Sequence, residues 1–429
     1  MKIWRSEEER CQRYLVRVEE RFGEVFSPAL EDKVRGVVAA IRRRGDAALI
    51  PMVRRYDLKG LAVKNFGLHG EVEAGTEVDE EFVAAVELAL ANLRAFHEAQ
   101  LQHGYTLEQD GGDSGIRVRP LDSVGVYVAG GASVYISSLL MAVVPAQTAG
   151  VARIAVATPP RAFMSSPHLR YLLDRLDLHE VYLMGGAHAI AALAYGTESV
   201  TPVDKIVGPG GRWVSAAKRA VFGVVGVDSI AGPSEVVVVA DGHADPDVVV
   251  ADLLAQAEHD PDALSILVTP SRTLAEKVDR KLKSALKALP TGSNARLALR
   301  RRGAIVVVPD EAAALDLVNR VAPEHVELLV NEPLRLLDGV ERAGAVYLGP
   351  FSPATLGDYV VGINHILPTA GAARYGSPLG VWDFVRRMAV VRVAPHRYRT
   401  LAKAAATLAM AEDLPLHAEA LLRGKRGSV

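Results

Sequence analysis

Residues 124–160, which read VGVYVAGGASVYISSLLMAVVPAQTAGVARIAVATPP, decide the fold class of this chain. The stretch opens with a short run rich in Val and closes with a second run, RIAVAT, at residues 153–158. Between them lie a glycine-rich turn and an apolar segment long enough for a helix. Two β-branched runs separated by a helix-length segment are typical of a βαβ unit, whose two strands are parallel.

The same alternation continues along the chain. Two further strand-like runs, EVYLMGG (180–186) and KIVGPGG (205–211), are each followed by a helical pattern. A second series begins at EVVVVAD (235–241) and ends with a helical pattern over residues 311–321. The sequence therefore predicts an α/β protein with two doubly wound, Rossmann-like parallel sheets and small helical extensions at its two ends.

The pattern also predicts how the chain divides into domains. We expect an N-terminal helical extension over residues 1–23, an α/β domain over 24–123 plus 236–378, a second α/β domain over 124–235, and a C-terminal arm over 379–429. Residues 24–120 are mostly helical by period, so we expect them to pack beside the second strand series. The arm is too small for a core of its own, so we expect it to dock on a second subunit.

Composition narrows the class of partner. Lys and Arg (49) nearly balance Asp and Glu (51) and are dispersed, so the sequence predicts no nucleic-acid partner and no anionic membrane surface. No apolar run approaches the roughly 18 residues that a membrane span needs. The first residues, MKIWRSEEER, are charged where a signal peptide would be apolar. We therefore expect a cytoplasmic protein that acts on a small molecule.

The single cysteine is a poor candidate for catalysis. Cys11 lies in a charged segment with a helical pattern, and no turn there presents a reactive thiol. One cysteine also excludes an intrachain disulfide. A mechanism through a covalent cysteine intermediate is therefore not expected.

Polar residues near the carboxyl end of one predicted helix suggest half of a metal site. Gln256 and His259 are three residues apart and therefore share one face of that helix. A solvated helix face is the common alternative for such a pair, although the neighbouring apolar residues favour burial. Asp358 follows a Gly/Pro-rich stretch after the strand-like AVYLG, where functional loops leave a parallel sheet.

Glu324 and His325 form a candidate acid/base pair. They stand between Pro323 and the strand-like VELLV, so both are expected at the mouth of a strand. A neighbouring carboxylate and imidazole suit proton transfer, because both groups titrate near neutrality when partly buried. The alternative is a strand-end pair held by backbone hydrogen bonds. His365 and His417 are single histidines near prolines, and residue type alone favours a structural role for each.

Glycine-rich turns follow several of the predicted strands, at residues 129–133, 184–188, 207–211 and 230–234. Backbone amides in such turns can approach a phosphate or a sugar. None of the turns is the dinucleotide fingerprint G-x-G-x-x-G, because Trp213 stands where the third glycine would follow Gly208 and Gly210.

Seven motifs in order make the chain resemble the histidinol dehydrogenase family over nearly its whole length. They are GPG with AKR (208–219), AGPSEV (231–236), DLLAQAEHD (252–260), PEH (323–325), GPFSPATLGDYVVG (349–362), NHILPT (364–369) and DFVRR (383–387). The resemblance implies two successive NAD-dependent oxidations of L-histidinol, through L-histidinaldehyde, to L-histidine. It assigns NAD to the domain at 124–235 and most of the substrate site to the other.

The resemblance also implies roles for single residues. One zinc ion per subunit would be bound by Gln256, His259, Asp358 and His417, the last from the other subunit of a homodimer. Glu324 and His325 would be the acid/base pair. The residues implied to contact substrate are Ser234, Gln256, His259, His325, Asp358, Glu412 and His417. Zinc prefers imidazole ligands, and a site without thiolates leaves positions for the amine and imidazole nitrogens of the substrate.

The departures from the family pattern concentrate where it holds NAD. Tyr127 matches the usual tyrosine, but His188 replaces a glutamine, Gly211 replaces an asparagine and Ala129 replaces a proline. A histidine can still make one hydrogen bond there, whereas Gly211 removes a side-chain contact. We therefore expect weaker or differently oriented NAD binding.

Two other functions remain open from the sequence. One is a zinc- and NAD-dependent dehydrogenase of another amino alcohol or polyol. The other is a zinc-binding paralogue without redox activity, which the altered NAD positions favour and which Glu324 and His325 argue against.

Overall fold

The structure of the chain is a computed structural model, and it describes residues 1–59, 66–69, 78–130 and 134–423. The glycine-rich turn at residues 129–133 lies partly outside the described residues. The chain forms two compact units: unit 1 comprises Met1–Gln100 and Asp122–Phe384, and unit 2 comprises Leu101–Leu121 and Val385–Val429.

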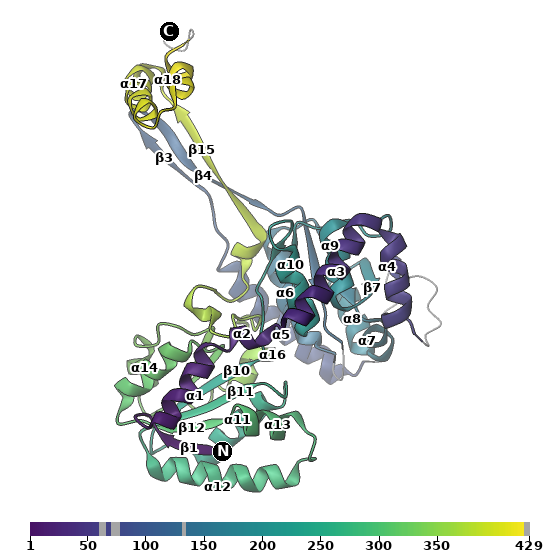
Figure 1. The fold of residues 1–429 in the computed structure, drawn as a ribbon, viewed down its shortest axis with the longest axis vertical. Coiled ribbons are helices and arrows are strands. Elements are labelled where there is room, and N and C mark those ends of the chain that lie inside the picture. The colour runs from purple at the N-terminus through teal and green to yellow at the C-terminus, as the bar shows by residue number, and fades with distance from the viewer. Residues whose placement is uncertain (60–65, 70–77, 131–133, 424–429) are drawn as a thin grey trace. The chain divides into compact units, whose positions relative to one another are not determined.

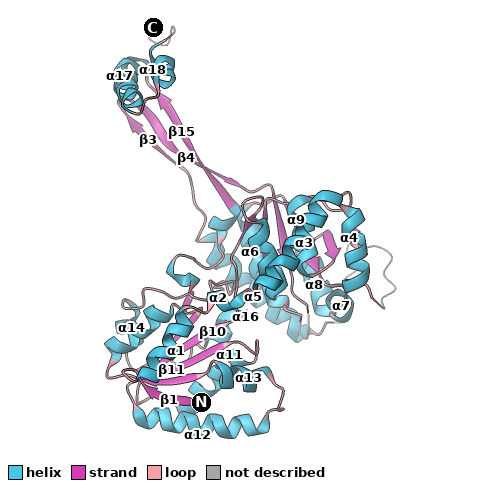
Figure 2. Ribbon diagram, viewed as in Figure 1, coloured by secondary structure: helices cyan, strands magenta, loops and turns pink. Residues whose placement is uncertain are grey.

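Unit 1 contains two six-stranded sheets flanked by helices (Figures 1 and 2), so the predicted α/β fold is confirmed. The first sheet has the order β2 (Gly67–His69), β7 (Glu180–Leu183), β6 (Arg153–Thr158), β5 (Ser123–Tyr127), β8 (Lys205–Val207) and β9 (Gly226–Val227). Only β2 is antiparallel to its neighbour among these paired strands. The central strand β5 is fully buried, as its continuous apolar run requires.

The second sheet is parallel throughout its described strands. Its order is β1 (Lys2–Arg5), β12 (Ala304–Val307), β11 (Leu264–Thr269), β10 (Glu235–Ala240), β13 (His325–Leu329) and β14 (Ala345–Leu348). In the register of the central pair, Val236 lies opposite His325. This pairing brings the starts of β10 and β13 together.

The helices follow the alternating pattern of the sequence. Those between or beside the strands of the first sheet are α3 (Pro28–Arg44), α4 (Asp46–Met52), the π-helix η1 (Val53–Asp57), α5 (Glu80–Glu98), α6 (Ile136–Ala149), α7 (Pro160–Ser165), α8 (Pro167–Arg175), α9 (Gly186–Tyr195) and α10 (Arg212–Val221). The others of unit 1 are α1 (Glu9–Glu19), α2 (Phe22–Val25), α11 (Pro246–Ala257), α12 (Arg272–Ala288), α13 (Asn294–Arg301), α14 (Glu311–Val321), α15 (Pro333–Leu337), α16 (Ala354–Tyr359), η2 (Ala372–Arg374) and η3 (Val381–Phe384).

The N-terminal quarter of the chain packs differently from the expectation. Residues 1–23 are not only helical, because β1 pairs with β12 and extends the second sheet. Helix α3 contacts α9 and α10, and its buried Val34, Val38 and Ile41 join the core of the first sheet instead of the second. An amphipathic helix shows from its sequence which face is buried, but it does not show which of two sheets covers that face.

Unit 2 is also assembled differently from the expected arm at residues 379–429. Its antiparallel sheet has the order β15 (Val385–Val393), β4 (Gly112–Pro120) and β3 (Tyr105–Gln109), so a mid-chain hairpin supplies two of its strands. Helices α17 (Pro395–Ala411) and α18 (Pro415–Leu422) pack on each other. Among the described residues of unit 2, the buried side chains are only Ala402, Ala406 and Ala418.

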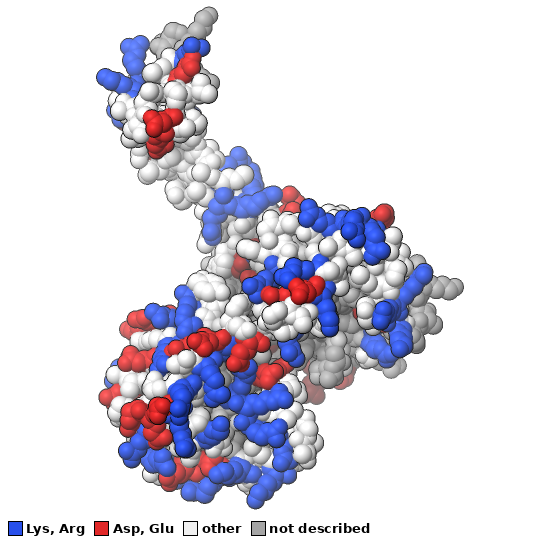
Figure 3. Space-filling view, in the orientation of Figure 1, with Lys and Arg blue, Asp and Glu red and all other residues white. Residues whose placement is uncertain are grey.

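Within the described part of the chain, no helix is both long enough and apolar enough to cross a bilayer. On the face shown in Figure 3, basic and acidic side chains are interspersed over the part of unit 1 that contains the second sheet.

Candidate active site

The candidate catalytic residues lie at the amino edge of the second sheet. Glu324 and His325 stand at the start of β13, and Ser234 precedes β10. Gln256 lies in the last turn of α11, and His259 follows that helix before β11 begins. Asp358 is not in a loop, since it lies in the last turn of α16. Helix α11 follows β10, and α16 follows β14. Each helix leads away from the carboxyl end of its strand, so Gln256 and Asp358 do not lie at the carboxyl edge of the sheet, where Asp358 was expected from the sequence.

Glu324 is buried and held by a backbone donor. The amide N–H of Glu235 donates to Oε2 of Glu324 over 2.8 Å. Burial raises the pKa of the Glu324 carboxyl well above its ordinary range, and the nearby carboxylates of Glu235 and Asp358 raise it further. This carboxyl therefore retains a proton to a higher pH than an exposed glutamate does.

His325 has the opposite shift. Burial, together with the nearby His365 and His259, lowers its pKa to about 3. Its Nε2 is 3.8 Å from Oε2 of Glu324, and its Nδ1 lies 3.4 Å from the hydroxyl of Tyr347. A neutral imidazole next to a carboxyl is a competent proton acceptor at physiological pH.

Three of the four residues expected to bind zinc lie in unit 1, near one another in the fold. Helix α11, which carries Gln256, contacts α16, which carries Asp358. His365 links α16 to α6. Its Nδ1 donates to the carbonyl of Asp358 in α16 over 2.8 Å, and its Nε2 is 3.1 Å from the hydroxyl of Ser138 in α6. Burial lowers the pKa of His259 and raises that of Asp358 to about 6.

The side chain of Gln256 provides the test of whether a cation fits here. It is 5% exposed, yet its Nε2 has no hydrogen-bond partner among the described residues. A buried amide atom without a partner is costly, and the two ends of an amide are assigned from their surroundings. With its oxygen at that position, Gln256 is a ready ligand beside an imidazole and a carboxylate, which is a donor set that suits zinc.

The described residues contain no group of three His, Cys, Asp or Glu side chains placed to hold a metal ion. Two features of the expected site account for this. One expected ligand, Gln256, is an amide, and another, His417, belongs to unit 2. Of the four expected ligands, only His259 and Asp358 are therefore both in unit 1 and of those residue types.

The sequence analysis did not single out a buried pair of carboxyl groups next to the site, Asp252 and Glu327. Asp252 and Glu327 each have one carboxyl oxygen without a partner among the described residues. The other oxygen of Glu327, Oε1, accepts from the amide of Ala354, the first residue of α16, over 2.7 Å. Burial and the charge of Asp252 raise the pKa of Glu327 to about 8, and burial also raises the pKa of Asp252, so Glu327 keeps its proton to a higher pH than an exposed glutamate does.

The sequence contains a signal for this pair. Asp252 precedes Gln256 by four residues and therefore shares its helix face, and Glu327 follows His325 by two residues and therefore shares its strand face. Both periodicities were available without the structure. Tyr347 and Ser138, in contrast, come from distant segments and gave no such signal.

The residues implied to bind the cofactor lie at the carboxyl edge of the first sheet. Tyr127 ends β5, and its hydroxyl accepts from the amide of Gly186, at the start of α9, over 3.1 Å. Gly208, which follows β8, has φ +108°, and a Cβ there would lie 2.2 Å from the carbonyl oxygen of Tyr127. Gly211 is different, because an added Cβ would meet nothing within 4 Å. There is therefore open space beside Gly211.

The side chain of His188, at the same edge of the first sheet, is paired with a carboxylate. Its Nε2 is 2.6 Å from Oδ2 of Asp57, the last residue of η1. Both side chains are buried at least nine-tenths, at 8% and 9% exposure. Only one ring nitrogen of His188 is thus available to a ligand.

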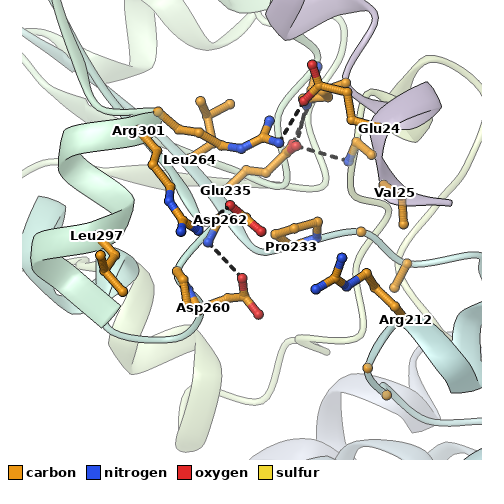
Figure 4. A pocket seen from close by; sticks show the side chains of 18 residues that line it. Glu24, Val25, Arg212, Pro233, Glu235, Asp260, Asp262, Leu264, Leu297 and Arg301 are labelled. Carbon is orange, nitrogen blue, oxygen red and sulfur yellow. Dashed lines mark hydrogen bonds and ion pairs between the residues drawn. The ribbon is translucent and has the colours of Figure 1, made fainter. Parts of the chain in front are cut away.

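A cavity of about 280 Å³ lies between the segments that carry the two groups of residues (Figure 4). Gly211 and Arg212 line it from the first sheet, and Pro233 and Asp260, the immediate neighbours of Ser234 and His259, line it from the second. Glu324 and His325 do not line it. The cavity is therefore next to the candidate acid/base pair and does not contain it.

The two implied substrate residues of unit 2 are both exposed. Glu412 follows the last residue of α17, and His417 lies in the first turn of α18. Neither is engaged in the small core of its own unit.

Comparison with known proteins gives one consistent result. The family model described as histidinol dehydrogenase matches residues 22–423. Curated proteins named histidinol dehydrogenase are 43% identical over 400 residues in Bacillus cereus (92% of this chain, 93% of the relative) and 45% over 397 residues in Caulobacter vibrioides (91% and 92%). The one from Thermus thermophilus is 44% identical over 403 residues (94% and 96%). The crystal structure of histidinol dehydrogenase from Elizabethkingia anophelis superposes with a TM-score of 0.88 at 30% identity, covering 98% of this chain and 97% of that one.

Proposed function

Because the chain belongs to the histidinol dehydrogenase family and is thus an oxidoreductase of histidine biosynthesis, we propose that it oxidises L-histidinol to L-histidine in two NAD-dependent steps. The observation that carries the proposal is the contrast between Glu324 and His325. Burial favours the neutral form of both, which gives one proton donor and one proton acceptor side by side. The sequence alternatives, another amino alcohol or a paralogue without redox activity, have no specific observation in their favour.

His325 is the group that accepts the proton of the substrate alcohol. Its imidazole is neutral at physiological pH, and Tyr347 orients the ring through Nδ1. Glu324 then acts on the aldehyde in its deprotonated form, which its raised pKa makes a stronger base than an exposed carboxylate, and this form accepts a proton from the water that adds to the carbonyl. The amide of Glu235 fixes the carboxyl during both steps. Each proton transfer of this kind contributes about 10²–10⁴-fold to the rate.

The proposed cofactors are one zinc ion per subunit and NAD. Zinc would be held by Gln256, His259 and Asp358, with His417 as the fourth ligand, and would polarise and orient the substrate. Tyr127, His188 and Gly211 would hold NAD, which would supply a hydride acceptor for each of the two oxidations, one NAD per step. Ser234 and Glu412 complete the proposed substrate contacts, since a carboxylate suits a cationic amine.

We propose further that the chain is a homodimer with shared active sites. Unit 2 buries few side chains of its own and exposes many apolar ones, including Leu107, Val391, Leu408 and Leu416. On the face shown in Figure 3, the surface along its strands carries few charged side chains over much of its length. Exposed apolar surface on this scale is typical of an interface. The cytoplasmic location expected from the sequence stays a prediction.

The decisive experiment is the stoichiometry of the reaction. The purified, zinc-loaded protein is given L-histidinol and NAD, and NADH and histidine are quantified together. Two NADH per histidine are expected from a four-electron oxidation. Absence of NADH, with zinc and histidinol both bound, would overturn the proposal in favour of a different cofactor or a binding role.

A further inference from the structure

Asp57 and His188 form a buried pair at the edge proposed to receive the dinucleotide. The residues are 131 positions apart in the sequence, and α4 with η1 packs on α9 to bring them together. The 2.6 Å contact joins Oδ2 of Asp57 to Nε2 of His188. A carboxylate only accepts hydrogen bonds, so Nε2 carries a proton whether the ring is neutral or charged.

This contact decides which atom of His188 is offered to a ligand. With Nε2 committed to Asp57, the only other polar atom of the ring is Nδ1. No hydrogen bond to Nδ1 is made within the described part of the chain. In the neutral ring this nitrogen is an acceptor, whereas a glutamine amide at the same position would present both a donor and an acceptor.

Gly186 leaves room on its side of Nδ1. A Cβ built on Gly186 would meet a single described atom within 4 Å, which is Nδ1 of His188 at 4.0 Å. On the neighbouring Gly185, a Cβ would be crowded, since it would lie 3.0 Å from Cγ of Pro159, 3.4 Å from Oδ1 of Asp57 and 3.5 Å from the Tyr127 hydroxyl. The backbone of these two glycines therefore lies close to the Asp57 carboxylate and the Tyr127 phenol, and only Gly186 leaves room beside the imidazole nitrogen.

We propose that Asp57 is a positioning residue for the cofactor: it locks the His188 ring so that Nδ1 accepts a hydrogen bond from a hydroxyl or carboxamide donor of the dinucleotide. The inference rests on the proposed NAD dependence and adds to it a residue outside the positions to which the resemblance gave a role. It also explains how His188 serves a place where the family uses glutamine. Without Asp57 the ring can rotate and exchange its tautomer, and both changes weaken an acceptor of fixed direction.

The alternative is that the pair only stabilises the packing of η1 on α9. A double-mutant cycle separates the two roles. If Asp57 acts through the His188 ring, its removal matters only while a histidine is present. If Asp57 acts through packing, its removal affects cofactor binding in the same way when residue 188 is glutamine.

The test is the affinity of the zinc-loaded full-length protein for NAD, measured by isothermal titration calorimetry. The variants are Asp57→Ala, His188→Gln and the combination of the two. We expect Asp57→Ala to weaken NAD binding by about 3–10-fold, the value of one hydrogen bond, and to have no further effect in the His188→Gln background. Equal weakening in both backgrounds, or no weakening in either, would overturn the inference.

Two controls keep the outcomes distinct. Asp32→Ala removes an exposed carboxylate of α3, which pairs with Arg35, and should leave NAD binding unchanged. Long-range ¹H–¹⁵N spectra of histidine-labelled protein report the His188 tautomer without any cofactor, and the Nε2–H form should become mixed in Asp57→Ala. If the wild-type protein binds no NAD, both the cofactor assignment and the role of Asp57 are overturned. If the wild-type protein binds NAD but the double-mutant cycle shows no coupling between Asp57 and His188, only the role of Asp57 is overturned.

Discussion

Arg21 and Glu235 form a two-point ion pair in which each side chain is only 3% exposed. The same guanidinium donates to the carbonyl of Val321, the last residue of α14, over 3.0 Å. The backbone N–H of Glu235 in turn holds the carboxyl of Glu324. Arg21, from the N-terminal segment, thus holds both the end of α14, which leads to Glu324 and His325, and the start of β10, which binds the Glu324 carboxyl.

Removing one member of this pair should be much more damaging than removing both. We expect Arg21→Met to cost about 3–5 kcal/mol of the free energy of unfolding, because it leaves the Glu235 carboxylate buried and uncompensated. The double variant Arg21→Met/Glu235→Met should be clearly more stable than the single one, although the amide of Ala370 loses its acceptor on Glu235. Urea denaturation measures both values. A double variant less stable than Arg21→Met would contradict the argument.

The sequence predicted the two sheets and the candidate ligands because those features depend on neighbouring residues. The Val-rich β10 and the turn of α11 that carries Gln256 are visible as local periodicity. The partners of these elements are not local: Arg21 reaches Glu235 over 214 positions and His188 reaches Asp57 over 131. The strands β3 and β4, whose exposed residues resemble an ordinary hairpin, gave no sign that β15 would pair with them.

The raised pKa of Glu327 beside Asp252 should be visible in the pH dependence of stability. The pKa of Glu327 is raised in the native state to about 8, so its contribution to stability is fully present below its ordinary range and is lost as the pH rises through about 8. Glu327→Gln is neutral at every pH and still offers an oxygen to the amide of Ala354. Between about pH 5 and pH 9, the free energy of unfolding of the metal-free wild type should therefore fall relative to that of the metal-free variant. Parallel curves for the two proteins would exclude a native-state shift at Glu327.

Zinc should stabilise the protein through the residues assigned to it. A ligand that binds only the native state raises the melting temperature by mass action, so added zinc should shift the thermal transition upward. His259→Ala should remove most of that shift. His243→Ala is the matched control, because its ring is 87% exposed beside Asp241 and lies outside the proposed site. Calorimetry with and without zinc distinguishes the variants, and an undiminished shift in His259→Ala would remove that residue from the ligand set.

Glu324→Gln should separate the two oxidations. The amide keeps the hydrogen bond from the Glu235 amide but cannot accept a proton from water, so oxidation of added histidinaldehyde should fall by about 10²–10⁴-fold. Binding of histidinol should change little. NADH formation from the alcohol and from the aldehyde measures the two steps, with the exposed Glu332→Gln as the matched control. Aldehyde oxidation at the wild-type rate would show that another group activates the water.

Mixing two inactive variants tests whether His417 serves the other subunit. His417→Ala and His259→Ala each remove one proposed zinc ligand, the first from unit 2 and the second from unit 1, so each homodimer should be inactive. In a mixed dimer with crossed sites, one site loses both ligands and the other keeps both. Random exchange makes half of the dimers mixed, so about a quarter of the wild-type activity should return. If His417 instead serves its own subunit, every site in the mixture lacks one ligand and no activity returns. Because His417 and Glu412 are exposed in unit 2 and the unit buries little of its own apolar surface, we expect the crossed arrangement.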